Sequence, residues 1–471
     1  MVTRRPTTHA PIDPPAVLDV GRVALYDRRR VDHPHPKGNS PTQGHDPAAV
    51  QERLACAPVV VPDPALMRPA LEDGDGILPS QWIRSAIEQG YISAPVAISP
   101  RQIQPNSLDL RLGTHGYRVQ CSFLPGKESA RQKLQRFKWY DVPIVEGGVV
   151  LERNQVYLFP LWERLDLPAH VSARANPKSS TGRLDIFTRL VTENGTAFDE
   201  VPRGYTGELY LEVVPRSFAI RVRPGDSLSQ ARFHLGDPRL SDQEIATFID
   251  TADIILDPHF HPLRARDLRI SSGIFLSVNL AGRPDSTIGY RAKKNTPPID
   301  LRAIGGARVR HYWERIFWRP SSPIILEPDE FYIFASRELV RLPPDVCAEM
   351  VPFDASSGEL RTHYAGFFDS GFGYESNPGL PPKGAAVVLE VRNRDVPFMI
   401  EDGHPLFRLL FLRNSEQPDI LYGGGVGSNY QHQRLRLGKQ FGADSEKQSS
   451  DSEAAEEEDA ESTKRQGRFQ F

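Results

Sequence analysis

The densest group of residues that could do chemistry lies at residues 176–187, which read NPKSSTGRLDIF. It combines two cations with hydroxyl donors and a glycine that lets a ligand approach the backbone closely. A guanidinium can hold an anion with two parallel donors, and an ammonium acts as a point charge. The segment therefore predicts a polyphosphate-binding loop made of Lys178, Ser179, Ser180, Thr181, Gly182 and Arg183. It lacks the G-x-x-x-x-G-K-[ST] pattern of a Walker A loop, and a polar turn between strands is the alternative interpretation.

A glutamate in the middle of an expected strand is the second signal. In ELYLEVV (208–214), alternation places Tyr210 and Glu212 on one face and the leucines on the other. A carboxyl group removed from water has a raised pKa and can carry protons near neutral pH. Glu212 is therefore a candidate proton carrier, and an ordinary exposed strand glutamate is the alternative. Gln230 in SLSQARF is a weaker candidate, since its amide could pair with the edge of a base.

These groups need a scaffold, and the composition points to short strands. The chain has 471 residues with 42 prolines and 36 glycines, which favour many turns over long helices. Leu108, Leu110 and Leu112 alternate with polar residues, which predicts a half-buried strand. A short helix capped by Ser80 is expected within residues 76–90. Further strands are predicted at 149–159, 208–214, 218–225 and 227–233, so the predicted fold class is mainly β with few short helices.

The strand pattern occurs twice in the same order. LPAHVSA at 167–173 is echoed by LPPDVCA at 342–348, about 175 residues later. The LEV triplet around Glu212 is echoed by the LEV triplet around Glu390 at nearly the same offset. Several ordered matches at a nearly constant offset predict an internal duplication, in which each copy is a compact β domain of ordinary size.

The duplication and the composition together predict the organisation of the chain. The N-terminal segment is rich in Pro, His, Asp and Arg and shows little periodicity, and the C-terminal segment is acidic, rich in serine and lacks aromatic residues, so we expect neither to form a packed core. We expect a flexible arm, a first domain, a helix with a linker, a second domain ending in a lid, and an acidic disordered tail, at residues 1–75, 76–239, 240–270, 271–441 and 442–471.

Charge and cysteine content exclude several classes of function. The net charge is −3, with 57 basic and 60 acidic residues, so no overall basic field is available to hold nucleic acid. No uninterrupted apolar stretch is long enough for a membrane span, and the N-terminus lacks the apolar core of a signal peptide. Cys56, Cys121 and Cys347 are odd in number and far apart, which favours a reducing, cytoplasmic location.

Several of these motifs together resemble a known family. IQPNSLDLRLG (103–113), PKSSTGR (177–183), the YLEV strand, the RPGD turn and the QARF strand occur in the order seen in the dCTP deaminase branch of the dUTPase-like superfamily. The chain resembles its longer, duplicated bacterial form over about residues 76–441. The resemblance implies two tandem dUTPase-like (β-clip) domains and hydrolytic deamination of dCTP to dUTP and ammonia, which feeds dUMP and dTTP synthesis.

The resemblance also implies roles for individual residues. Residues 178–183 would hold the phosphates, Ser179 would help to position the attacking water, and Glu212 would shuttle protons. Asp199, in an uncertain register, matches a hairpin acid near the deoxyribose, and Tyr422 and Gln433 in the C-terminal lid would reach the nucleotide. Asn429 stands where the family often has lysine. Mg²⁺ would arrive on the triphosphate, dTTP is a candidate inhibitor, and a homo-oligomer with trimer-like symmetry is expected.

The sequence independently argues against a zinc deaminase. Such enzymes need H-x-E and P-C-x-x-C, but none of the 13 histidines is followed by x-Glu and no two cysteines form a C-x-x-C pair. We therefore expect no zinc and a protein carboxylate as the base. A dUTP diphosphatase or bifunctional enzyme using Asp369, and a nucleotide-binding regulator without turnover, are the alternatives.

The two copies are not equivalent in sequence. Where the first has KSSTGR, the second has DASSGELR (354–361), which lacks the lysine. Its HYAGFFDSGFG (363–373) nevertheless resembles the nucleoside-holding hairpin of the superfamily better than the first copy's hairpin does. We expect the first copy to carry catalysis. Alternatively, the hairpin and lid of the second copy complete a site whose phosphate loop comes from the first.

Overall fold

The computed structural model describes the chain from residue 74 to residue 442 with short gaps. The described residues are 74–320, 322–351, 361–362, 366–375, 383–393, 395–423 and 430–442. Nearly all of the predicted N-terminal arm and acidic tail, the 352–360 segment of the second copy and Asn429 lie outside the described residues. We refer to residues 76–235 as the first half and to residues 255–442 as the second half.

The described part of the chain is mainly β, as predicted, and its helices are short. The first is the expected helix near the N-terminus, where Trp82, Ile83 and Ala86 are buried on one side. Ser80 does not cap it, because the N-cap is Pro79, and the Ser80 hydroxyl instead donates to Asp419 at 2.5 Å. The helices are α1 (Ser80–Glu88), α2 (Ala130–Phe137), α3 (Ser179–Gly182), α4 (Asp242–Ala252) and α5 (Val309–Tyr312), with 3₁₀ turns at Pro100–Gln102 and Ala265–Asp267.

The first half is built on two antiparallel sheets. One has the order β1-β13-β8-β10, with β3 also pairing with β13: β1 (Gly76–Ile77), β13 (Ser227–Leu235), β8 (Val171–Pro177), β10 (Glu200–Val201) and β3 (Leu108–Arg111). The other has the order β5-β4-β7-β11-β9, with β2 also pairing with β7: β5 (Lys138–Pro143), β4 (His115–Val119), β7 (Tyr157–Asp166), β11 (Thr206–Pro215), β9 (Ile186–Thr192) and β2 (Ile92–Ser93).

The second half pairs its strands in a similar way. One sheet has the order β19-β16-β21-β25-β23, with β14 on β21: β19 (Trp313–Phe317), β16 (Thr287–Ala292), β21 (Phe331–Val340), β25 (Ala385–Arg392), β23 (Arg361–Thr362) and β14 (Ile255–Leu256). Another has the order β15-β27-β22-β24: β15 (Ile274–Ser277), β27 (Pro405–Arg413), β22 (Val346–Val351) and β24 (Phe367–Phe368). Two ribbons pair β18 (Ala307–Arg308) with β28 (Phe441–Gly442), and β20 (Ile324–Leu326) with β26 (Phe398–Ile400).

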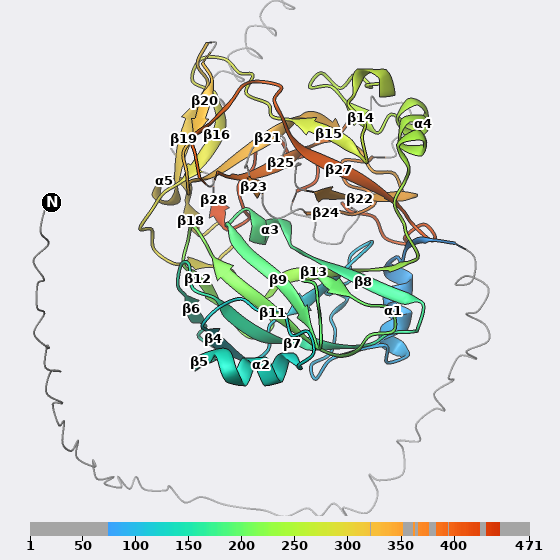
Figure 1. Ribbon diagram of the computed structural model, residues 1–471. Coiled ribbons are helices and arrows are strands. Elements are labelled where there is room, and N and C mark those ends of the chain that lie inside the picture. The colour runs from blue at the N-terminus through green and yellow to red at the C-terminus, as the bar shows by residue number, and fades with distance from the viewer. Residues whose placement is uncertain are drawn as a thin grey trace, which may run out of the picture. The chain divides into compact units, whose positions relative to one another are not determined.

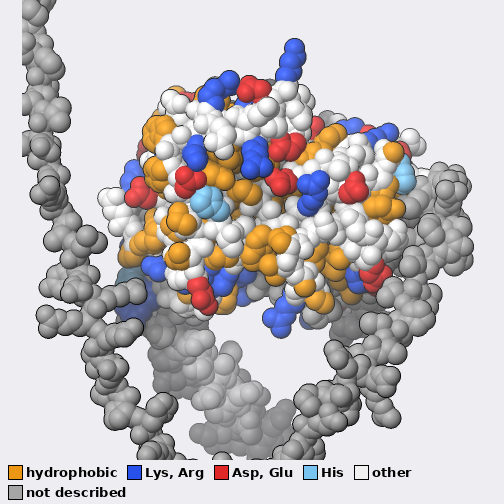
Figure 2. Space-filling model, turned by 90° about the horizontal axis from the view of Figure 1, so that it is seen from below, with side chains coloured by type: hydrophobic (Ala, Val, Ile, Leu, Met, Phe, Trp, Pro, Cys, Tyr) orange, Lys and Arg blue, Asp and Glu red, His pale blue; other side chains and the backbone are white. Residues whose placement is uncertain are grey.

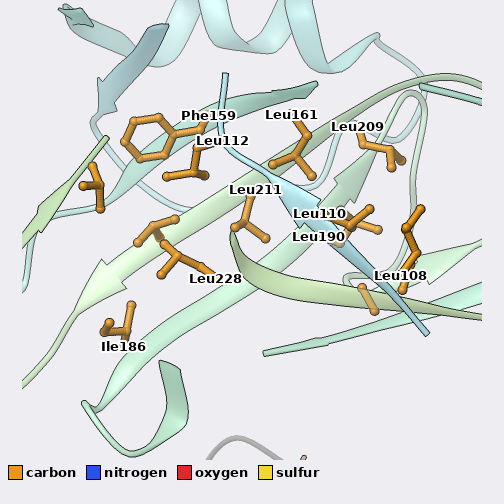
Figure 3. Close-up of a cluster of buried hydrophobic side chains, with 14 of the residues drawn as sticks. Leu108, Leu110, Leu112, Phe159, Leu161, Ile186, Leu190, Leu209, Leu211 and Leu228 are labelled. Atoms are coloured by element: carbon orange, nitrogen blue, oxygen red, sulfur yellow. The ribbon is translucent and has the colours of Figure 1, made fainter. Parts of the chain in front are cut away.

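Alternation along the strands sends leucines and other apolar side chains into the core of the first half. Figure 3 shows side chains from β3, β7, β9, β11 and β13 gathered in one cluster, including Leu110, Leu190 and Leu211. The polar residues of β3 differ from the prediction of a half-buried strand, because Asp109 and Arg111 are buried as well. Arg111 forms an ion pair with Glu163 at 2.7 Å, so one face of this strand is a buried polar layer.

The hydrophobic core of the first half extends into the second half, which also has a core of its own. The cluster of the first half continues into the second through residues such as Trp313, whose ring meets that of Phe218 at 5.3 Å between centroids. A third sheet also crosses the boundary, because β17 (Ile299–Asp300) pairs with β12 (Ile220–Val222), which in turn pairs with β6 (Val149–Leu151). In Figure 1, α3 lies on the side of the first half that faces the second half.

Surface features are consistent with the balanced charge. On the face shown in Figure 2, basic and acidic side chains are interspersed rather than gathered in a field of one sign. No helix among the described residues has both the length and the apolar character needed to cross a membrane.

A buried ion pair across the boundary gives a test of how the halves hold together. Arg392 of β25 binds Asp185, which is fully buried and also accepts a hydrogen bond from Ser217 at 2.6 Å. Arg392→Gln leaves this carboxylate buried without its cation. We expect a loss of about 3–5 kcal/mol in the free energy of unfolding, measured by urea denaturation.

The matched control is Arg291→Gln, which breaks the exposed ion pair with Glu314. It should change the free energy of unfolding by less than about 1 kcal/mol, because solvent screens exposed pairs. Equal effects of the two substitutions would show that the buried pair does not hold the halves together.

Candidate active site

The predicted phosphate loop forms a single helical turn at the end of β8. Lys178 is the N-cap of α3, and its N–H donates to the Leu228 carbonyl at 3.0 Å. The Thr181 hydroxyl donates to the same carbonyl at 2.8 Å. These two bonds fix the turn on β13. The Thr181 hydroxyl therefore anchors the loop, and its proton is not available to a ligand.

The turn forms one wall of a cavity of about 690 Å³ between the two halves, a volume typical of small-molecule sites. The first half contributes Asp109, Lys178, Ser179, Ser180, Arg183 and Gln230. The second half contributes Asp369, Glu390, Tyr422, Tyr430, Gln433 and Lys439. The structure thus brings together most of the predicted phosphate loop, Gln230 and the two predicted lid residues.

Glu390 of β25 is one of the acidic residues that line this cavity, together with Asp109 and Asp369. It lies directly against the backbone of Gly182, since a Cβ placed on that glycine would be 2.1 Å from Glu390 Oε2. Its side chain is buried, and Oε2 has no hydrogen-bond partner within the described part of the chain. Burial raises the pKa of Glu390 well above its ordinary value, although nearby Arg183 opposes the shift.

Arg183 is held by the C-terminal segment of the second half. Its guanidinium donates to Gln433 Oε1 at 2.8 Å and to the Arg436 carbonyl at 3.0 Å, and it stacks on the Tyr430 ring at 3.7 Å. Its Nε has no partner among the residues described. Burial lowers the pKa of Arg183. The predicted phosphate fork is therefore largely engaged in joining the two halves.

Two ion pairs flank the site. Lys178 binds Asp109, whose other oxygen, Oδ1, lacks a described partner. Asp369 binds Arg232 across the boundary at 2.8 Å, and both side chains are almost completely buried. Gln230 accepts a hydrogen bond from Ser107 at 3.3 Å. In the described ranges, no three His, Cys, Asp or Glu side chains gather as a set that could hold a metal ion.

The structure places Glu212 and Asp199 outside this cavity. The Glu212 carboxylate is buried, and Ser122 of its own half donates a hydrogen bond to it. Asp199 accepts the Leu190 N–H at 2.7 Å, and burial raises the pKa of Asp199 to about 7. Within one chain, Ser179 lines the cavity and Glu212 does not.

Glu212 and Glu390 have different surroundings because different elements cover the corresponding faces of β11 and β25. Tyr210, on the same face of β11 as Glu212, packs against Ala130 and Leu134 of α2. The first half therefore covers this face with its own helix. On β25, the face that carries Val388 and Glu390 lines the cavity beside α3.

Of the two arrangements left open by the sequence, the structure favours a site shared between the halves. Phe367, Phe368 and Asp369 of the second-half hairpin line the cavity together with the first-half loop. In the sequence, Glu390 stands out only as the counterpart of Glu212 in the second copy of the repeat. Asp109, Tyr430 and Lys439 were not predicted as cavity residues. Asp109 could have been found from its place in the IQPNSLDLRLG motif, whereas no motif marks Lys439.

Comparisons with known proteins identify the family to which the chain is similar. The 2′-deoxycytidine 5′-triphosphate deaminase (DCD) N-terminal domain matches residues 74–237, and the C-terminal domain of the same family matches residues 250–441. The chain is similar to the crystal structure of 2′-deoxycytidine 5′-triphosphate deaminase from Agrobacterium tumefaciens, with a TM-score of 0.69 and 44% identity, covering 75% of this chain and 100% of that one.

Curated relatives named "dCTP deaminase, dUMP-forming" also match. The Coprothermobacter proteolyticus protein is 30% identical over 140 residues, which cover 29% of this chain and 71% of that protein. The Clavibacter michiganensis protein is 30% identical over 200 residues, which cover 41% of this chain and 86% of that protein. The matches to both domains of the family and to a solved deaminase show that the chain is a hydrolytic deaminase. The chain belongs to the dCTP deaminase family.

The raised pKa of Glu390 makes a prediction about stability. A carboxyl whose pKa is higher in the folded state favours folding below its unfolded pKa, and this contribution is lost as pH rises through the folded value. Glu390→Gln mimics the neutral form at every pH. We therefore expect the variant to gain stability relative to the wild type as pH rises above about 4.5.

Urea denaturation at a series of pH values measures this difference. Glu146→Gln, which removes one exposed negative charge, is the control for a general charge effect. A stability difference between Glu390→Gln and wild type that stays constant from pH 5 to 8, or that matches the control, would contradict the buried-acid assignment.

Proposed function

We propose that this chain deaminates dCTP to dUTP and ammonia in the cavity between its two halves. The observation that carries the proposal is the buried carboxylate of Glu390, which packs against the 178–183 turn and whose Oε2 has no hydrogen-bond partner among the residues described. A turn with hydroxyls and cations suits a triphosphate, and a desolvated carboxyl suits proton transfer near neutral pH. Membership of the dCTP deaminase family supports the same substrate.

In this proposal, Glu390 takes the role that the sequence had given to Glu212. Neutral Glu390 donates its proton to N3 of cytosine as water, positioned with Ser179, attacks C4. The resulting carboxylate accepts a proton from the water and passes it to the amino nitrogen. Ammonia leaves, the C4 hydroxyl returns a proton to Glu390, and the C4 carbonyl of uracil forms. Every proton is accounted for, and no transition metal is required.

The phosphates would lie at the cationic end of the cavity. Lys178 and the hydroxyls of Ser179 and Ser180 line it, and polar donors of this kind suit phosphate oxygens. In this proposal Mg²⁺ enters as part of the substrate, bound to the triphosphate. Gln230 and the lid residues Tyr422 and Gln433 would contact the nucleotide from the other walls.

We also propose that the two halves are tandem dUTPase-like copies. The LEV strand is central in both, since β11 pairs with β7 and β9, and β25 pairs with β21 and β23. The cavity then corresponds to a contact between two copies of one domain. Assembly of several chains with trimer-like symmetry, and inhibition by dTTP, remain part of this proposal.

Paired glutamine substitutions test the assignment of the proton carrier. Glu390→Gln should reduce kcat for dCTP by about 10²–10⁴-fold, because an amide cannot carry the proton. Glu212→Gln, the matched control on the corresponding strand, should retain most of the activity. Ammonia release measures both rates. The opposite pattern would return the role to Glu212 and indicate a site that needs another chain.

A second candidate function is formation of dUMP and pyrophosphate from dCTP. It is favoured by Asp369, a carboxylate that lines the same cavity and could activate water at the α-phosphate. The ion pair of Asp369 with Arg232 argues for dUTP as the product, because this carboxylate is already engaged.

Chromatography of the nucleotides after incubation with dCTP and Mg²⁺ decides between the two products. We expect dUTP and ammonia without pyrophosphate, and equal rates with and without a zinc-selective chelator, since a carboxyl activates the water. Stoichiometric dUMP would establish the second function, and loss of activity with the chelator would exclude the metal-independent mechanism.

A further inference from the structure

Lys439 is a cation of the cavity that no motif in the sequence singled out. Its side chain lines the cavity that holds the phosphate loop. No carboxylate lies within ion-pair distance of its ammonium among the residues described, and the ammonium forms no hydrogen bond there. A partly buried cation without a counter-ion is costly, and it suggests that an anion binds at this position.

The charges around Lys439 show which end of the cavity it occupies. Burial and the neighbouring Lys178 lower the pKa of Lys439, while Asp109 and Asp226 oppose the shift. Lys439 therefore lies near Lys178 in the cavity.

The other cations of the cavity are already compensated. Lys178 is paired with Asp109, and Arg183 donates to an amide and a carbonyl oxygen. Arg101 lies at an exposed position, where water screens its charge. Lys439 is thus the cavity cation whose charge has the least compensation from the protein.

The backbone around Lys439 is fixed. Its N–H donates to the Tyr430 hydroxyl at 3.2 Å, and its carbonyl accepts the Gly305 N–H at 3.0 Å. The next residue, Gln440, accepts the Ala307 N–H at 2.9 Å, where β28 pairs with β18. Because the Tyr430 ring also stacks on Arg183, the segment is tied to the phosphate loop. The backbone that carries this cation is therefore fixed before any ligand binds.

We propose that Lys439 binds the terminal phosphates of the nucleotide and makes the site select triphosphates over diphosphates. This inference rests on the proposed function, since it assigns a phosphate contact to the same cavity.

The test compares the dCTP and dCDP affinities of wild type and Lys439→Gln. Loss of one charge-assisted contact should raise the KM for dCTP by about 10- to 100-fold, with a much smaller change in kcat. The inhibition constant of dCDP, measured as a competitor of dCTP, should change by less than about threefold. The preference of Lys439→Gln for dCTP over dCDP should therefore be much smaller than that of the wild type.

Two further variants make the result specific. Lys439→Arg keeps the charge and should recover most of the dCTP affinity. Lys294→Gln, which removes a lysine outside the cavity, should leave KM and the dCDP inhibition constant unchanged. If Lys439→Gln does not fold, as judged by its thermal transition, Lys439→Met replaces it, because methionine has a similar length without charge.

The outcomes separate this inference from the proposed function. Wild-type turnover of dCTP, with unchanged KM and unchanged triphosphate preference in Lys439→Gln, would overturn the inference alone. Absence of wild-type turnover would overturn the proposed function. In that case, calorimetric binding of inorganic tripolyphosphate still tests Lys439: a weaker affinity in Lys439→Gln supports the contact, and equal affinity overturns it.

Discussion

The packing of the Glu390 carboxylate on the backbone of Gly182 is the constraint on which the site depends. A side chain at position 182 would collide with that carboxylate, since even a Cβ would lie 2.1 Å from Oε2. Glycine at position 182 leaves the space that this carboxylate occupies beside α3. This contact sets an acid beside a turn of hydroxyls and cations, although the two come from parts of the chain about 200 residues apart. The active-site arrangement is therefore a property of the boundary between the halves, rather than of either half alone.

Some polar groups at the boundary between the halves have hydrogen-bond partners, and others do not. Away from the cavity, Arg392, Asp185 and Ser217 satisfy one another in a buried cluster. Inside the cavity, Glu390 Oε2, Arg183 Nε and Asp109 Oδ1 have no partner among the residues described. A buried polar atom without a partner costs about 1–3 kcal/mol, so three of them in one place are not expected from packing alone. A nucleotide offers an amino group and phosphate oxygens that suit such atoms.

The sequence predicted much of the local structure. The KSSTGR turn, most of the strands and the helix that follows Ser241 appear where their patterns indicate. The pairing of acid and loop was not predictable, because Glu212 and Glu390 have the same immediate neighbours. The distinction arises from helix α2, which covers the face of one strand and has no equivalent on the face of the other that meets α3. Asp109 and Arg111 look solvent-facing by alternation, but tertiary packing buries both.

The sheet that crosses the boundary has a consequence for folding during synthesis. β12 of the first half obtains one of its neighbours, β17, from the second, and Phe218 is covered by Trp313. A nascent chain that has emerged only as far as Leu235 therefore lacks part of its own core. During synthesis, part of the hydrophobic core of the first half therefore stays exposed until residue 313 has left the ribosomal exit tunnel. The long-range pairing of the first half makes this a slow stage that is open to association with other chains. Chaperone demand during synthesis should accordingly peak between these two points.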